Sequence, residues 1–395
     1  MNKSDTPDQT ARSYIKSWDN FINIVAEDKS VNLIALAVTQ WTASSIDALI
    51  FFLTDMGIAV NASIVIAEHR TNGYLIDSSS FTNNQSQYFY LPYKESSPHA
   101  NQSPQGKWQK LRDTLNYYRI IFSWPLQKNS TLYYATFNHE TPDAIIINKY
   151  HHIGRPMVIC GIEEGVGIYM GTLNHIYPKL RDINSISEFH GYFRAVFMGR
   201  TLYRILHPHH NSLTLKSTCK GLTVNKAIVP YYRKVFSMHK LSLPTSLDAS
   251  IISQSIIICT VAWKRECIYD NEDYRVMKKV CDYLYNRGQK LLLKPHPRDQ
   301  FFPERASDMH CQLFSPKGVS LEVLCEFAQP RAIISFSSTT LINPQVFWGI
   351  PTYCISEMLD RDKIGDVYLN EFSRFKSTFK NFVHFIHNEH EIDIV

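Results

Sequence analysis

Several common nucleotide-binding and metal-binding patterns are missing from this chain. It contains no GxxxxGK[ST] phosphate loop and no GxGxxG dinucleotide loop, so neither glycine-rich nucleotide site is expected. Its eight cysteines form no CxxC pair, and several lie inside apolar runs. Buried free thiols in a reducing cytoplasm are therefore the preferred interpretation.

Long hydrophobic segments are also missing. No apolar run approaches the roughly 18–20 residues that a membrane-spanning helix needs. The first residues, Met1-Asn-Lys-Ser-Asp-Thr-Pro-Asp8, lack the apolar core of a signal peptide. We therefore expect a cytoplasmic protein, with peripheral attachment to the inner face of the cell membrane left open.

What is present is an ordinary globular composition. The 395 residues are 44% hydrophobic, 13% aromatic and 19% charged, which excludes general disorder and predicts two domains. The formal net charge of +5 suits an acidic ligand or an anionic membrane surface. This excess is too small and too dispersed to indicate a nucleic-acid partner.

Strand-like apolar runs alternate with helical periodicity, which predicts parallel βαβ units and an α/β fold. Strands are expected at 31–38, 61–67, 88–93, 131–137, 144–148, 157–162, 255–261, 290–293, 332–335 and 352–355. Helices are expected at 44–56, 108–124, 272–286, 320–328, 341–348 and 367–386.

The stretch 208–250 is rich in Lys, Ser, Thr and Pro, lacks clear periodicity and is interpreted as a linker. The predicted divisions are 1–225, 226–375 and a C-terminal helix over 376–395 that packs near the domain junction. Two doubly wound lobes facing a central cleft are the expected architecture.

The first chemistry-bearing motif is Gly161-Ile-Glu163-Glu164-Gly165, at the end of an apolar strand. Neighbouring like charges raise one carboxyl pKa, which suits a general base. A solvated acidic turn is the alternative interpretation.

The second motif is Lys294-Pro-His296-Pro297-Arg298, which also follows an apolar strand. The flanking prolines exclude a helix and present the imidazole on a stiff extended loop. Histidine can give a proton to a departing phosphate oxygen near neutral pH, and the two cations can offset negative charge. A structural turn histidine is the alternative.

The third motif is Ser337-Ser338-Thr339-Thr340, between the strand at 332–335 and the helix at 341–348. Hydroxyl and N–H groups at a helix start can bind a phosphate or carboxylate, or can simply cap the helix. Upstream, Glu322 lies in the first turn of a predicted helix. It could accept hydrogen bonds from ribose hydroxyls or serve only the helix dipole.

Three other patterns have more ordinary interpretations. Asp360-Arg-Asp362 matches a metal-binding DxD pattern, but it follows the last predicted strand, where capping is expected. His207-Pro-His209-His210 follows a predicted helix without an adjacent Cys or acid to complete a metal site. The basic aromatic run 372–386 could touch a membrane, although packing between the lobes is preferred.

The order acidic-acidic-Gly, His-Pro and Ser-Ser/Thr on two α/β lobes resembles the bacterial sialyltransferases. The most similar group contains the capsular polysialyltransferases and the lipooligosaccharide sialyltransferases. The resemblance covers residues from about 160 to 350 and implies a glycosyltransferase-B fold with two Rossmann-like domains. It also implies a CMP-activated nonulosonic acid donor, a surface-glycan acceptor, inversion at the anomeric carbon, and no metal or other cofactor.

The same resemblance implies roles for individual residues. Glu163, or else Glu164, is expected to deprotonate the acceptor, and His296 to stabilise or protonate the departing phosphate. The expected donor-binding residues are Lys294, Pro297, Arg298, Glu322, Ser337, Ser338 and Thr339.

Alternatives remain open. A CDP-glycerol glycerophosphotransferase of the teichoic-acid type also uses His and Ser-Ser loops, but an acid usually follows the serines, and here Asn343-Pro follows. The transferred sugar could be pseudaminic, legionaminic or 3-deoxy-octulosonic acid. A degenerate pair of lobes that only binds an acidic glycan is the non-enzymatic alternative.

Overall fold

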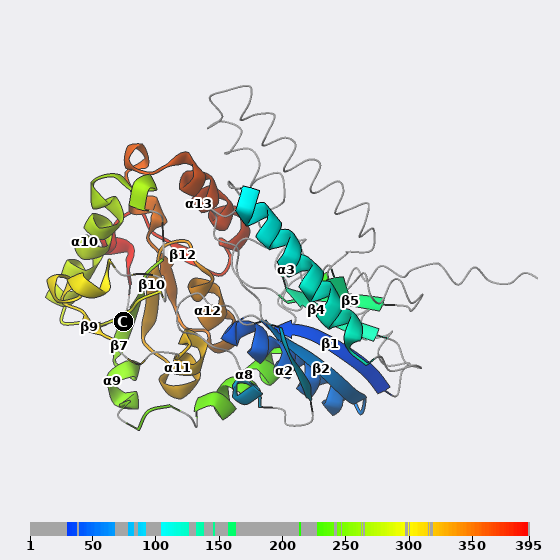
Figure 1. The fold of residues 1–395 in the computed structure, drawn as a ribbon. Coiled ribbons are helices and arrows are strands. Elements are labelled where there is room, and N and C mark those ends of the chain that lie inside the picture. The colour runs from blue at the N-terminus through cyan, green and yellow to red at the C-terminus, as the bar shows by residue number, and fades with distance from the viewer. Residues whose placement is uncertain are drawn as a thin grey trace, which may run out of the picture. The chain divides into compact units, whose positions relative to one another are not determined.

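The computed structural model describes most of the chain between Ser30 and Asp393. The described residues are 30–37, 39–67, 78–82, 86–91, 104–125, 132–137, 145–146, 157–162, 213–214, 227–240, 243–245, 247–261, 263, 265–296, 299, 301–314, 316 and 319–393. The chain divides into two compact units (Figure 1). Among the described residues, the first unit extends to Thr214 and the second begins at Ala227.

Where the structure describes the chain, each unit is built on a parallel sheet of six strands. The strand order is β3-β2-β1-β4-β5-β6 in the first unit and β12-β11-β10-β7-β8-β9 in the second. Numbered from its own first strand, each sheet has the order 3-2-1-4-5-6 that is typical of Rossmann folds. The prediction of two doubly wound α/β units is therefore confirmed.

In the described part of the first unit, two long helices pack against the sheet. The strands described there are β1 (Ser30–Ala37), β2 (Ala59–Ala67), β3 (Gln87–Leu91), β4 (Leu132–Phe137), β5 (Met157–Ile162) and β6 (Leu213–Thr214), and the long helices are α2 (Gln40–Asp55) and α3 (Pro104–Ser123). Ile34 and Leu36 of β1 share a core cluster with Tyr117 and Ile121 of α3. Because side chains alternate along a strand, Leu33 points to the opposite face of the sheet.

The second unit has six strands and six α-helices among its described residues. The strands are β7 (Ser255–Cys259), β8 (Lys290–Lys294), β9 (Gln312–Leu313), β10 (Ala332–Ser335), β11 (Thr352–Cys354) and β12 (His384–Phe385). The helices are α8 (Val229–His239), α9 (Ala249–Ser253), α10 (Glu272–Asn286), α11 (Leu321–Ala328), α12 (Ile342–Trp348) and α13 (Asp366–Phe379).

The central strands of this sheet are buried on both faces. In β7, Ile256 and Ile258 belong to the core cluster that contains the apolar face of α10. Their neighbour Ile257 belongs to a second cluster, formed with α9, α11 and α12. This double burial explains why the strand is a continuous apolar run rather than an alternating one.

One predicted strand is wrong. Ile145 and Ile146, within the strand expected at 144–148, have helical backbone and lie outside the sheet. Both side chains are buried with Tyr117 of α3. A short apolar run fits a strand and a buried helical turn equally well, so its periodicity could not distinguish the two.

The expected linker at 208–250 contains a packed helix. In α8, Tyr232, Val235 and Phe236 are buried. Their i, i+3, i+4 spacing is that of a helix packed along one face. Phe347 of α12 stacks on Tyr232, with ring centroids 5.3 Å apart, so α8 is part of the second unit's core.

The C-terminal helix expected at 376–395 is also wrong in its extent. Helix α13 ends at Phe379, and His384–Phe385 form β12, which pairs with β11. The edge strand is only two residues long, too short for a period-two pattern to appear in the sequence.

The prediction of free thiols is confirmed for the six cysteines whose side chains the structure describes. Six are free, and of these Cys267 alone is partly exposed while the other five are buried. Among the described helices, none combines the length and the apolar character needed to cross a bilayer.

Candidate functional site

The candidate residues of the second unit lie at the carboxyl edge of its sheet. Because all strands are parallel, the segments that follow β7, β8, β10 and β11 leave the sheet at one edge. The strand order changes direction between β7 and β10, and doubly wound sheets bind ligands beside such a switch point. Thr260 follows β7 and Ser337 follows β10 after one residue, so both flank this point.

The His-Pro loop is fixed to the neighbouring strand by two hydrogen bonds. The backbone N–H of His296 donates to Thr260 Oγ1 at 2.9 Å, and the N–H of Thr260 donates to the carbonyl of Lys294 at 3.4 Å. Thr260 is only 3% exposed. The histidine backbone is therefore tied by a buried hydroxyl to the end of β7, the strand that borders the switch point.

Lys294 ends β8 with a half-buried side chain. Burial lowers the pKa of Lys294, and the nearby Glu322 carboxylate opposes this shift. Its ammonium group lies 5.9 Å from the ring centroid of Phe314. A cation held in a partly desolvated position binds an anionic ligand more strongly than a surface lysine does.

The serine loop contains one buried and one partly exposed serine. The Ser337 hydroxyl is 3.0 Å from the hydroxyl of Ser356, which also accepts the Ser337 N–H at 3.0 Å. Ser337 is 4% exposed, so its present geometry supports the loop. Ser338 is only partly buried, and its hydroxyl accepts the N–H of Thr340 at 3.3 Å, at the start of a 3-10 turn that includes Thr339.

Glu322 lies in the first turn of α11, as the sequence predicts. Asn343 of α12 donates its side-chain amide to Glu322 Oε1 at 2.7 Å. Asn343 is 4% exposed and the carboxylate is partly exposed. This contact fixes the carboxylate orientation and leaves Oε2 able to accept further hydrogen bonds.

Four predicted site residues lie outside the described residues: Glu163, Glu164, Pro297 and Arg298. Strand β5 ends at Ile162, so the acidic pair follows the carboxyl end of a strand in the first unit, as predicted. Their roles remain predictions.

The patterns with ordinary interpretations can be checked in part. Asp360 caps a short 3-10 turn by accepting the N–H of Asp362 at 3.1 Å, which confirms its capping role. Within the described ranges, no three His, Cys, Asp or Glu side chains form a group suited to a metal ion. The histidines at 207–210 lie outside those ranges.

The basic aromatic run forms most of α13. Phe372, Phe375 and Phe379 are at most 5% exposed and belong to the core clusters of the second unit. These rings are therefore unavailable for membrane contact. They pack within the core of the second unit, and not between the lobes as the sequence interpretation preferred.

The sequence interpretation missed three supporting residues: Thr260, Asn343 and Ser356. Thr260 gave a usable signal, because it is the polar residue that ends the apolar run of β7. The other two gave none, since each contacts a partner 19 or 21 residues away through the fold.

Comparisons with known proteins agree with this architecture. The structure is similar to a putative UDP-N-acetylglucosamine 2-epimerase from Listeria monocytogenes, with a TM-score of 0.50 and 9% identity over 89% of this chain and 90% of that one. It is also similar to the UDP-GlcNAc 2-epimerase of Methanocaldococcus jannaschii (TM-score 0.49, 9% identity, 91% and 90% coverage). A third neighbour is an E. coli heptosyltransferase (TM-score 0.38, 12% identity, 85% and 90% coverage).

At these identities the first neighbour shows the fold alone, which is of the glycosyltransferase-B type with two Rossmann-like units. No curated protein matches the chain by sequence. The family model described as alpha-2,8-polysialyltransferase matches residues 10–356. The chain therefore belongs to the alpha-2,8-polysialyltransferase family and is a glycosyltransferase of the sialyltransferase type.

Proposed function

We propose that this protein transfers sialic acid, or a related nonulosonic acid, from its CMP-activated donor to a hydroxyl of a surface glycan in a capsule or lipooligosaccharide. The observation that supports this most directly is the hydrogen bond from the His296 N–H to Thr260, which follows the strand that lies between β8 and β10. The strand order changes direction beside that strand, which is where a doubly wound domain binds a nucleotide.

In the proposed reaction, the acceptor hydroxyl attacks the anomeric carbon of the donor sugar. A bond forms between these two atoms, the bond from the anomeric carbon to the phosphate oxygen breaks, and its electron pair leaves with CMP. The hydroxyl proton passes to Glu163, or else to Glu164. Attack opposite the leaving group inverts the anomeric carbon.

His296 is the residue proposed to stabilise the departing phosphate by donating a hydrogen bond or a proton. Lys294 supplies positive charge from the end of β8, and Pro297 and Arg298 complete that loop. The partly exposed Ser338 and Thr339 are proposed to contact the phosphate or the sugar carboxylate, while buried Ser337 holds their loop through Ser356.

Glu322 is proposed to accept the ribose hydroxyls of CMP. The hydrogen bond from Asn343 leaves a carboxylate oxygen for this contact. These groups together provide the charge stabilisation that the reaction needs without a metal ion, which is how we propose the enzyme works.

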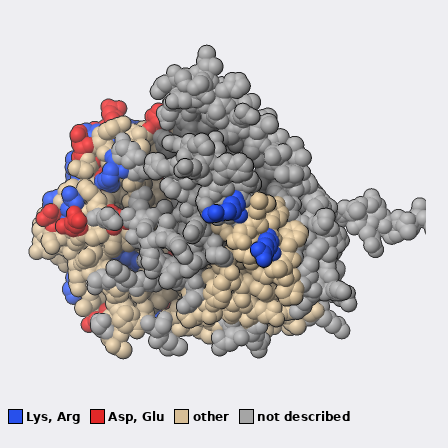
Figure 2. Space-filling view, in the orientation of Figure 1, with Lys and Arg blue, Asp and Glu red and all other residues tan. Residues whose placement is uncertain are grey.

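The acceptor is proposed to be part of an anionic or neutral surface glycan, reached from the cytoplasmic side of the membrane. On the face of the second unit seen in Figure 2, cationic and acidic side chains are interspersed rather than separated by sign. We propose single additions rather than repeated elongation of a long polyanion, because the net charge of +5 is a small excess for a long basic groove.

The test is to measure CMP release from a panel of CMP-activated nonulosonic acids and from CDP-glycerol, with mass analysis of the products. We expect turnover of CMP-sialic acid or a close relative, with loss of at least ~100-fold in rate in His296→Ala, the usual effect of losing a proton-transfer group. His310→Ala is the control, because this partly exposed imidazole stacks on Tyr285 next to β9. Turnover of CDP-glycerol alone, or full activity in both Glu163→Gln and Glu164→Gln, would contradict the proposal.

A further inference from the structure

A chain of contacts leads from a buried acid at the start of α10 to the loop that carries His296. Asp273 is fully buried in the first turn of α10. Its carboxylate accepts hydrogen bonds from both terminal guanidinium nitrogens of Arg265. Arg265 lies in the segment that follows β7. Arg265 in turn lies over the ring of Phe301, with its guanidinium carbon 4.3 Å from the ring centroid.

Phe301 belongs to the loop that follows β8, five residues after His296. Asp299 Oδ1 accepts the N–H of Phe301 at 2.9 Å, and the N–H of Asp299 donates to the carbonyl of His296 at 2.8 Å. Arg305 also contacts Phe301, with its guanidinium carbon 3.9 Å from the ring centroid and Nη1 donating to the Phe301 carbonyl at 2.8 Å. The ring is therefore fixed by two cations and by the loop backbone.

The two ends of this loop have their own anchors. Thr260 holds the N–H of His296, and Phe302 is 1% exposed in the core. Between these anchors, the contact from Arg265 to Phe301 links the loop that follows β8 to the segment that follows β7. Tyr274 of α10 also meets the Phe301 ring edge-on, with ring centroids 6.0 Å apart. Cation–π contacts and bidentate ion pairs have strict geometry, so they define an orientation rather than merely adding stability.

We infer that Asp273, Arg265 and Phe301 are positioning residues that orient the His296 loop for transfer. The inference rests on the proposed function, because that function gives His296 its role in transfer. The contacts from Asp273 to the His296 loop do not depend on it. A displacement of about 1 Å at a reacting group can lower a rate by roughly 100-fold. A positioning role therefore predicts a larger effect on kcat than on the donor KM.

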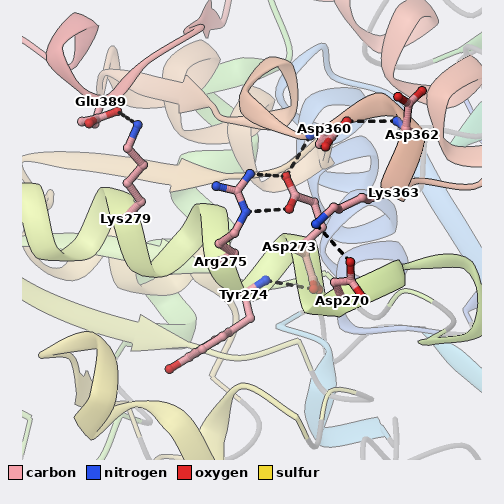
Figure 3. A network of polar contacts seen from close by, with 10 residues as sticks. Asp270, Asp273, Tyr274, Arg275, Lys279, Asp360, Asp362, Lys363 and Glu389 are labelled. Carbon is pink, nitrogen blue, oxygen red and sulfur yellow. Dashed lines mark hydrogen bonds and ion pairs between the residues drawn. The ribbon is translucent and has the colours of Figure 1, made fainter.

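The same helix offers a matched control. Glu272 precedes Asp273, is also fully buried, and accepts two hydrogen bonds from Arg275 at 2.6 and 2.7 Å. It also accepts the backbone N–H of Asp360 at 2.8 Å, so this pair joins α10 to the 360–363 segment instead of the His296 loop (Figure 3). Arg265→Ala and Arg275→Ala thus each break an ion pair with a buried acid in the first turn of α10. Only the Arg265 pair leads on to the loop that carries His296.

The experiment measures two quantities in Arg265→Ala, Asp273→Asn, Phe301→Leu, Phe301→Tyr and Arg275→Ala. The first is kcat and KM for CMP release, and the second is the rate at which diethyl pyrocarbonate modifies His296, followed by peptide mass mapping. We expect Arg265→Ala, Asp273→Asn and Phe301→Leu to lower kcat at least ~10-fold and to change the modification rate several-fold. Phe301→Tyr keeps the ring and Arg275→Ala keeps the loop contact, so both should resemble the wild type in both readouts.

Equal effects of Arg265→Ala and Arg275→Ala, or no recovery in Phe301→Tyr relative to Phe301→Leu, would overturn the inference. Should Arg265→Ala fail to fold, the two Phe301 variants decide the question alone. The modification rate does not depend on any donor. A wild-type protein that releases no CMP would therefore contradict the proposed function while the positioning role is still tested.

Discussion

The backbone N–H of His296 and the hydroxyl of Thr260 form a 2.9 Å hydrogen bond between the ends of β8 and β7. These residues are 36 positions apart in the chain, and the threonine is almost fully buried. The bond ties the loop of the proposed leaving-group histidine to the end of β7, which borders the point where the strand order reverses, and it leads to the first prediction.

Thr260→Val should remove the acceptor without changing the side-chain volume much, and leave a partly buried N–H unsatisfied. We expect a loss of about 1–3 kcal/mol in the free energy of unfolding, the usual cost of an unsatisfied buried donor. CMP release should fall as well, because the loop loses its anchor. Urea unfolding and initial rates test both effects, and Thr260→Ser should retain most stability and activity. Equal behaviour of the valine and serine variants would show that the hydroxyl is irrelevant.

Lys294→Met should weaken donor binding without weakening the fold. Burial lowers the pKa of Lys294, so its charged form is disfavoured in the folded protein relative to the unfolded chain. The resulting loss in the free energy of unfolding is full below the folded-state pKa of Lys294. It shrinks as the pH rises from that pKa to the unfolded-state pKa. We therefore expect an unchanged or higher free energy of unfolding at pH 7, together with a raised donor KM.

The control for this prediction is Lys290→Met, at the opposite end of β8. The Lys290 ammonium donates to Gln254 at 2.6 Å, away from the carboxyl edge of the sheet. Its loss should leave the donor KM unchanged. Clear destabilisation by Lys294→Met would show that its charge is stabilising after all.

Ser338→Asp should separate capping from ligand binding. Aspartate is as good a helix-start cap as serine, so the turn at Thr339–Leu341 should persist and thermal unfolding should change little. The added negative charge should repel the donor phosphate and raise the KM for the donor by ~10-fold or more. In contrast, Ser337→Ala should mainly lower stability by about 1 kcal/mol, since it loses the contact with Ser356. A normal KM in Ser338→Asp would remove this serine from the donor site.

Glu272 should contribute to stability in a pH-dependent way. Burial alone would raise the pKa of Glu272, but hydrogen bonds from Arg275 and from the Asp360 N–H hold it below its usual value. A lowered folded-state pKa gives stability that is fully present above the unfolded value of about 4.3, and that is lost as the pH falls through the folded value. Urea unfolding should therefore show Glu272→Gln to be less stable than wild type at pH 7, with the difference shrinking below about pH 4. A constant difference across this range would contradict the assignment.

Local structure in the second unit was largely predictable from the sequence. The strand at 290–294 is an apolar run that ends at two prolines, and helix 272–286 has acids in its first turn and a 3.6-residue period. Helix α8 was missed, because its buried Tyr232 and Phe236 stand in a stretch rich in Lys, Ser, Thr and Pro. Strand β12 was missed because it exists only through pairing with β11.

The sequence allowed us to predict which residues are candidates for the site, but not which other residues they contact. The motifs themselves identified His296, Ser338 and Glu322, since each lies at a strand end or in a first helical turn. Nothing in the sequence could show that Ser337 is closed off by Ser356, or that Asn343 holds Glu322. These partners come from different βα units and meet only in the folded domain.

The amino-acid sequence by itself determined where most strands and helices form and which polar groups follow them, because periodicity, proline and capping act over a few neighbouring residues. Only the tertiary structure decided that β7 lies between β8 and β10, and therefore that Thr260 contacts the histidine loop. The physical reason is that parallel strands pair across whole helical crossovers. Their order depends on burying both faces of the sheet together, which no local pattern records.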